Sequence, residues 1–137
     1  MATSEAVRST LTRTLTAWSV GSIATGAVLL ARRPGDRGTG FARQTLAWGA
    51  VDLAIAALSL RRPRAVPEAE AVASLRRLLL LNAVLDVGYV TIGALLWRAG
   101  RVRGRDSVGD GAGVVVQGAF LLVLDTVSAL QLRTTPA

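Results

Sequence analysis

The sequence contains no cysteine, no histidine and no lysine. These absences exclude disulfides, thiolate zinc sites, haem held by Cys or His, cysteine nucleophiles and imidazole acid–base catalysis. Charged residues make up only 18% of the chain, against about 25% in a typical soluble domain. All 16 basic residues are arginine, and they give a formal net charge of +7. Carboxylates are therefore the main candidates for acid–base chemistry.

What the chain does contain is four long apolar segments, which cover residues 14–31, 41–60, 78–97 and 111–132. Each is at or near the roughly 20 residues that a helix needs to cross the hydrocarbon core of a membrane. The arginines lie in short clusters between the segments, which have almost no charge on any face, whereas a soluble amphipathic helix keeps a charged outer face. The sequence predicts a multi-pass protein of the cell membrane.

The connections between these segments are short, over residues 32–40, 61–77 and 98–110. Short connections favour an all-α, up-down-up-down four-helix bundle with both termini on the same side, and residues 1–137 form a single transmembrane domain. The first segment is long for a signal peptide and lacks a small-residue cleavage site, so we expect it to stay as a span. Eight arginines fall on each side, so the positive-inside rule does not assign the orientation.

Three aspartates interrupt the apolar segments: Asp52, Asp86 and Asp125. A charged side chain in mid-membrane costs about 2.5–3.5 kcal/mol on insertion scales, and such residues usually face the bundle interior and mark function. Counted from the segment ends, all three lie roughly 11–12 Å below the side that holds the termini. Three carboxyls on three helices at one depth are expected to share one interior site.

Other polar and aromatic residues follow the same helix faces. Asn82, Asp86 and Tyr89 form one stripe, as do Gln44, Trp48 and Asp52, and Gln117 lies two turns before Asp125. The expected catalytic residues are Asp86, Asp52, Asp125, Asn82 and Tyr89, and the expected substrate-binding residues are Trp18, Ser22, Gln44, Trp48, Gln117 and Phe120. Ser, Asn and Gln also join membrane helices by simple hydrogen bonds, and this alternative stays open for Ser22, Gln44, Asn82 and Gln117.

Residues 44–56, 81–89 and 117–125 resemble a family of small four-helix prokaryotic membrane proteins of uncharacterised function. The most specific part is the Asn-x3-Asp-x-Gly-Tyr block from Asn82 to Tyr89. The resemblance covers about the last two-thirds of the chain and implies the fold and topology while leaving the function open. Asn is common in the family at the position of Asp52, which marks this carboxyl as a departure. A weaker likeness, in size and pocket chemistry only, is to small membrane-bound terpene cyclases.

The pattern favours an enzyme. Carboxyls close together in a medium of low dielectric cannot all be ionised, and a protonated Asp in a dry pocket is a general acid. Aromatic faces beside it can stabilise a developing cation. We therefore expect acid-initiated cyclisation or isomerisation of a lipid-soluble isoprenoid. No Asp-Asp-x-x-Asp motif supports diphosphate ionisation by magnesium, so no metal or other cofactor is expected, although a metal site made of the three Asp residues stays open.

Two other functions are kept as alternatives: a small proton-coupled transporter or channel subunit, and a structural membrane subunit. Membrane lipid and a lipid-soluble small molecule are the expected partners, and self-association is left open. Nucleic acid is excluded as a partner, because the arginines flank the spans with no interleaved aromatics to stack on bases. These arginines are expected to anchor the protein against anionic lipid headgroups.

Overall fold

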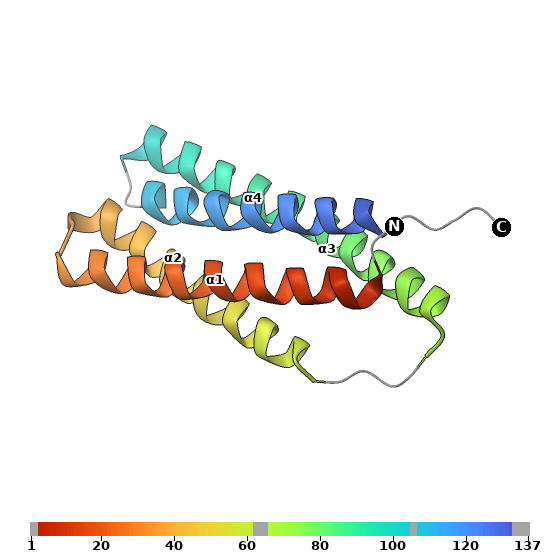
Figure 1. Cartoon of the computed structure of the whole chain (residues 1–137). Coiled ribbons are helices and arrows are strands. Elements are labelled where there is room, and N and C mark those ends of the chain that lie inside the picture. Colours follow the sequence, from red (N-terminus) through yellow and green to blue (C-terminus); the bar gives the residue numbers. More distant parts are fainter. Residues whose placement is uncertain (1–2, 62–65, 105–106, 133–137) are drawn as a thin grey trace.

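The computed structural model describes residues 3–61, 66–104 and 107–132 and consists of four helices (Figure 1). They are α1 (Ser4–Ala31), α2 (Gly35–Ser59), α3 (Glu68–Arg103) and α4 (Ser107–Gln131). No strand occurs in these described residues. The prediction of an all-α protein with four helices is confirmed.

The helices extend well beyond the predicted apolar segments, so most of each connection between the segments is helical. The first connection shortens to Arg32–Pro34, and α3 begins at Glu68 and continues to Arg103. Arginine is common in all three connections and the second also contains Ala and Glu, residues that favour helix, and a helix does not end where its apolar segment ends. α3 stops at Gly104, whose φ of 62° suits glycine because it has no Cβ.

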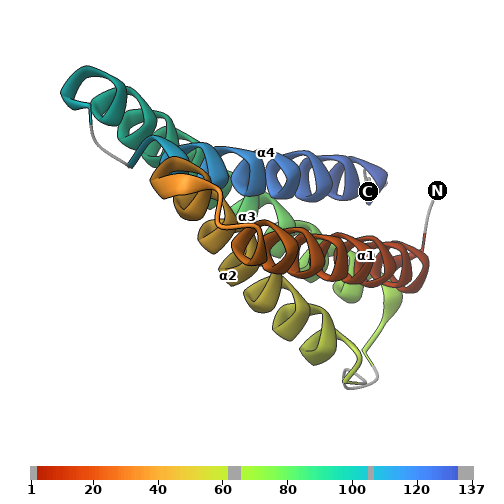
Figure 2. The ribbon, with the colours of Figure 1, turned by 90° about the vertical axis from the view of Figure 1, so that its left-hand side faces the viewer.

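The helices form two pairs that are joined through α4. α1 packs along α2, α3 packs along α4, and α2 contacts α4, whereas α1 touches α3 and α4 only slightly. The α1–α2 turn lies at the same end as the end of α3 and the start of α4 (Figure 1). The start of α1 and the end of α4 lie at the opposite end, called here the terminal end. Toward that end, α2 diverges from the other helices (Figures 1 and 2).

Glycines on α4 allow the close packing at the end away from the termini. A Cβ on Gly109 would overlap the carbonyl oxygen of Arg37 on α2, and one on Gly111 would overlap the backbone nitrogen of Trp97 on α3. Such small residues let helix backbones approach closely, as is common between membrane helices. The bundle is therefore fastened at one end and spread at the other.

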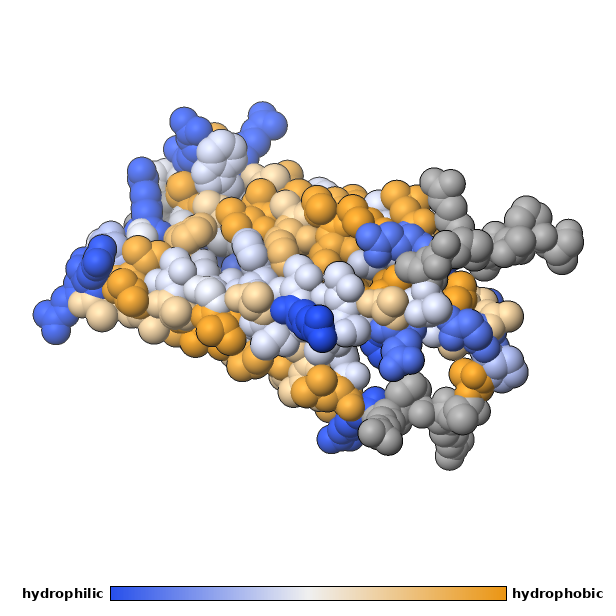
Figure 3. Space-filling view, viewed as in Figure 1, coloured by the Kyte–Doolittle hydropathy of each residue, from blue (hydrophilic) through white to orange (hydrophobic). Residues whose placement is uncertain are grey.

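Three helices, α1, α3 and α4, are long and apolar enough to cross a membrane. α2 has 25 residues, but Arg43, Gln44 and Asp52 lower its apolar content. Large apolar side chains are exposed on the outside, for example Val84 at 69% and Leu95 at 61%. Apolar residues cover much of the middle of the face seen in Figure 3, and charged residues gather mainly toward its ends. Soluble monomers rarely expose this much apolar surface, which indicates a membrane protein.

The starts of α1 and α3 are joined by two hydrogen bonds at the terminal end. The Ser4 backbone N–H donates to Glu68 Oε1 at 2.6 Å, and the Ser4 hydroxyl donates to Glu68 Oε2 at 2.9 Å. The backbone N–H, followed by the hydroxyl, holds the pKa of the Glu68 carboxyl below its ordinary value. The ionised carboxylate thus ties α1 to α3.

Substitution of glycine at the close-packed end should weaken the bundle. We expect Gly109→Ala to lower the unfolding free energy in detergent by about 1–3 kcal/mol, because its Cβ has no space beside α2. The matched control is Gly88→Ala, where nothing lies within 4 Å of the added Cβ. That variant should be neutral or gain up to about 1 kcal/mol of helix propensity. Equal effects of the two substitutions on thermal unfolding would contradict the close packing.

The Ser4–Glu68 contact predicts a pH-dependent stability difference. A lowered folded-state pKa stabilises the protein above the ordinary pKa of the carboxyl, and this gain is lost as the pH falls through the lowered value. Glu68→Gln should therefore melt below the wild type at neutral pH and together with it in strong acid. Glu70→Gln, on the same first turn of α3, is the control. A melting difference that persists in strong acid would argue against the ionised contact.

Candidate functional site

A cavity of about 300 Å³ lies between the four helices and contains all three aspartates. Asp52 comes from α2, Asp86 from α3 and Asp125 from α4, and their exposed fractions are 0%, 4% and 8%. All three side chains line this one cavity, each from a different helix. The structure thus brings the three carboxyls into one interior site.

Each aspartate lies on the single buried stripe of its helix. On α2 the buried residues recur with helical spacing as Thr45, Gly49, Asp52 and Ala56. On α4, Asp125 lies between the buried residues Gly118 and Ala129. Most of the other buried residues on these two helices are small.

The carboxyls are poorly supplied with hydrogen bonds. Among the described residues, Asp52 Oδ1, Asp52 Oδ2 and Asp86 Oδ2 are buried without a partner. A buried polar atom left without a partner costs about 1–3 kcal/mol. Asn82, one of the expected catalytic residues, lines the same cavity and lies beside the carboxyl of Asp125 on α4.

Within the part of the chain that the structure describes, no ion pair joins a basic group to these three carboxyls. The ion pair found among the described residues lies elsewhere. It joins Arg43 Nη2 to Asp110 Oδ1 at 2.8 Å, close to the glycine contacts of α2 and α4. Gln44 Nε2 donates to the same Asp110 oxygen at 3.1 Å. Gln44, predicted to bind substrate, is therefore engaged in joining α2 to α4 and does not line the cavity.

Two aromatic side chains meet at the wall of the cavity. The rings of Trp48 on α2 and Tyr89 on α3 lie 5.1 Å apart at 71°, edge to face. Both line the cavity with the aspartates, and Tyr89 is 38% exposed. Their ring faces and edges are thus available beside the carboxyls, as the sequence pattern suggested.

The cavity opens sideways between α2 and α3. The backbones of these helices do not come near each other along their length, yet residues from both line the cavity. Its outer rim includes Val51 and Ile55 of α2 and Leu78 and Leu85 of α3, each about half exposed. The rim belongs to the apolar outer surface of the molecule. An apolar molecule in surrounding lipid would therefore reach the carboxyls without crossing a polar surface.

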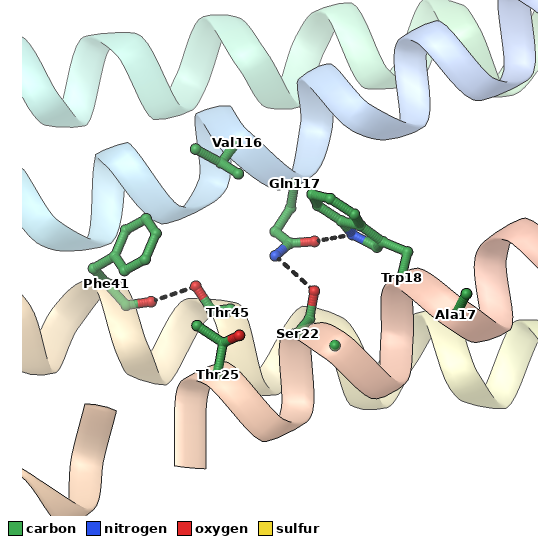
Figure 4. A pocket seen from close by; sticks show the side chains of 9 residues that line it. Ala17, Trp18, Ser22, Thr25, Phe41, Thr45, Val116 and Gln117 are labelled. Carbon is green, nitrogen blue, oxygen red and sulfur yellow. Dashed lines mark hydrogen bonds between the residues drawn. The ribbon is translucent and has the colours of Figure 1, made fainter. Parts of the chain in front are cut away.

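A second hollow of about 320 Å³ contains other predicted residues (Figure 4). Trp18 Nε1 donates to Gln117 Oε1 at 2.7 Å, and Gln117 Nε2 donates to Ser22 Oγ at 3.3 Å. Phe120 stacks on Trp18 with ring centroids 3.9 Å apart. Trp18, Ser22 and Gln117 line this hollow and not the carboxyl cavity, so the structure separates them from the aspartates.

Sequence reasoning missed three polar residues that line the carboxyl cavity, namely Arg8, Thr12 and Ser59. Arg8 and Thr12 lie one turn apart, with Leu15 on the same face, so the helical spacing could have placed them together. Both precede the first apolar segment, and the arginines that flank the segments were expected only to anchor the protein against lipid headgroups. The described residues contain no group of three or more Asp or Glu side chains arranged to hold a metal ion, which counts against the metal alternative.

The profile of one protein family matches residues 14–126, which include all three aspartates. The chain belongs to the DUF6992 family, a family of unknown function. The resemblance to an uncharacterised family is thereby confirmed. No curated protein and no solved structure matches the chain. The likeness to terpene cyclases gains no support from these comparisons, and membership of the DUF6992 family assigns no activity.

Replacement by leucine should affect stability differently at two buried polar residues of this DUF6992 protein. Asp52→Leu removes two oxygens that have no partner, so the unfolding free energy in detergent should stay equal or rise. Gln117→Leu removes the acceptor of the Trp18 N–H and should lower the unfolding free energy by about 1–3 kcal/mol. Thermal unfolding of the two variants side by side checks both. If Asp52→Leu lowered the unfolding free energy as much as Gln117→Leu, the Asp52 carboxyl would have hydrogen-bond partners after all.

Proposed function

We propose that this protein crosses the cell membrane four times, up-down-up-down, as one domain with both termini on the same side. Support comes from the exposed apolar surface and from the three helices of spanning length and composition. α2 would cross with its polar residues turned inward, because Asp52 and Thr45 are buried in the bundle. The carboxyl cavity then lies within the hydrocarbon layer, where unpaired polar groups are costly and are usually functional.

On this basis we propose an enzyme that uses a buried carboxylic acid to cyclise or isomerise a lipid-soluble isoprenoid. The observation that carries the proposal is the set of partnerless carboxyl oxygens in a cavity that opens sideways onto the apolar surface. An uncharged carboxyl both tolerates this environment and has a proton to give. The lateral opening suits a substrate that arrives from the membrane.

Asp86 is the proposed acid because it lines the cavity one turn from Tyr89 on α3 and has a partnerless oxygen. Its proton passes to one carbon of a substrate double bond, whose π electrons form the new C–H bond and leave the other carbon cationic. A second double bond of the substrate attacks the cation and closes a ring by a C–C bond. A neighbouring carbon then returns a proton to the carboxylate and becomes part of a new double bond. The product is an isomer of the substrate, so nothing else is consumed.

The surrounding residues have distinct parts in this proposal. Trp48 and Tyr89 would stabilise the cation through their rings, an interaction worth about 2 kcal/mol or more where water is excluded. Asp52 and Asp125 would favour the protonated form of Asp86, because neighbouring carboxyls cannot all carry charge. Asn82 would hold Asp125 in place.

The proton-coupled transporter is less well supported. A transport path needs free polar groups beyond the carboxyls, and Gln44 and Gln117 were the candidates. Gln117 is held between Trp18 and Ser22, and Gln44 is held by Asp110. Neither amide is free to line a path, so the carboxyl cavity has the character of a pocket with a lateral entrance.

Solvent deuterium provides the test. Purified protein in uncharged micelles is incubated in deuterated water with farnesol, geranylgeraniol or squalene, and mass spectrometry follows deuterium in substrate and product. The wild type should incorporate deuterium, since protonation of a double bond brings in a solvent-derived hydron. Asp86→Asn should lose about 10²–10⁴-fold in rate, because it keeps the shape but has no acidic proton. Tyr89→Phe should lose less, since the ring is retained.

Asp36→Asn is the matched control, because Asp36 lies exposed on the first turn of α2, away from the cavity. Full incorporation by a folded Asp86→Asn would refute the assignment of the acid. If no isoprenoid takes up deuterium and acidification drives Asp86-dependent proton uptake into proteoliposomes, the transporter replaces the enzyme. If neither occurs, the protein is a structural subunit.

A further inference from the structure

A polar recess of about 770 Å³ lies at the terminal end, next to the carboxyl cavity. We call it the vestibule. It is formed by the start of α1, the end of α2 and the start of α3. The vestibule and the cavity share five residues at their boundary, which are Arg8, Thr12, Ser59, Leu75 and Leu78. The two spaces therefore adjoin, with charged side chains gathered at the terminal end and apolar ones around the carboxyls.

Arg8 is the charged residue at this boundary. It is half-buried, and among the described residues no hydrogen bond or ion pair includes it. Glu68 also lines the vestibule, but both of its oxygens accept hydrogen bonds from Ser4. The other charged groups that line the vestibule are Glu5, Arg13, Arg61 and Glu70. Arg8 differs from them in reaching the carboxyl cavity as well.

A guanidinium in this position is suited to an anionic oxygen group. Its five N–H donors match the oxygens of a phosphate in a two-pronged contact, which is stronger and more specific than a single hydrogen bond. Leu78 marks the boundary on α3, and Asp86 lies eight residues further along, at about 12 Å. A ligand that fills both spaces therefore needs an anionic head and an apolar chain of at least this length.

We propose that the vestibule and the cavity together bind a phosphate-headed isoprenoid, with the phosphate on Arg8 and the chain extending to the carboxyls. This inference rests on the proposed function, since it takes the carboxyl cavity as the substrate site. It narrows the substrate class from any lipid-soluble isoprenoid to one that keeps its phosphate. The double bond that Asp86 reaches is then one far from the head, not the one beside it.

Calorimetric titration of the purified protein in uncharged micelles tests the inference without turnover. The probes are farnesyl phosphate, farnesol, inorganic phosphate and dioleoyl phosphatidic acid. Farnesyl phosphate should bind about tenfold or more tightly than farnesol, the gain expected of a hydrogen-bonded charge pair. Arg8→Gln should remove this gain and leave farnesol binding unchanged, and Arg8→Lys should keep part of it.

Arg77→Gln is the matched control, because Arg77 is exposed at the same end and does not line the vestibule. An equal loss in Arg8→Gln and Arg77→Gln would overturn the inference in favour of general surface charge. Equal affinity for inorganic phosphate or for phosphatidic acid would overturn it in favour of a phosphate site or a bilayer-lipid site. Should Arg8→Gln not fold, the affinities of the wild type and of Arg8→Lys for farnesyl phosphate and farnesol decide. A preference for farnesyl phosphate that is unchanged in Arg8→Lys would overturn the inference.

The two proposals fail separately in these experiments. Asp86→Asn should abolish deuterium uptake and leave the preference for farnesyl phosphate over farnesol intact. A phosphate preference that depends on Arg8, without deuterium uptake by any isoprenoid, would sustain the binding site and refute the catalytic acid. Deuterium incorporation into farnesol, without a preference for farnesyl phosphate, would sustain the catalytic acid and refute the phosphate site.

Discussion

The close approach of α4 to α2 and α3 is the contact on which the rest of the structure depends. It is possible only because glycines on α4 face the backbones of both neighbours, at Gly109 against Arg37 and at Gly111 against Trp97. Tight packing between membrane helices comes from such contacts. Lipid tails are as apolar as leucine side chains, so the hydrophobic effect does not drive the helices together. With α2 and α3 both fastened to α4 at one end, α2 diverges at the other. The spread between them makes the cavity and its lateral opening.

The cavity combines features that a merely structural bundle would avoid. Among the described residues, three carboxyls line one cavity with no ion pair to any of them, and several of their oxygens have no hydrogen bond. By contrast, the polar side chains of the second hollow satisfy one another through Trp18, Gln117 and Ser22. The same fold thus contains a satisfied polar network that joins helices and an unsatisfied one that faces open space. This contrast is the physical reason for proposing the aspartates as the functional site.

Much of the fold followed from composition and spacing. The four apolar segments gave the number of helices, and the helical recurrence of Asn82, Asp86 and Tyr89 indicated one face. The helix ends were less predictable, because the sequences flanking the segments also favour helix. The sequence could not show which polar residues line the carboxyl cavity and which join helices by hydrogen bonds. Trp18, Gln44 and Gln117 have the same residue types and depths as a binding site would have, and only their partners show that they join helices.

The sequence by itself determined that this protein is helical and apolar and that three of its helices carry an inward-facing aspartate, because residue type and spacing fix the burial preference of each helix face. Only the tertiary structure decided which helices touch. The glycine contacts bring α4 against both α2 and α3 and leave α2 and α3 apart, a choice that depends on shape complementarity between segments far apart in the chain. The same packing made Arg8 part of the cavity and gave Asn82 to Asp125, since side chains on different helices become neighbours only when their backbones have been placed.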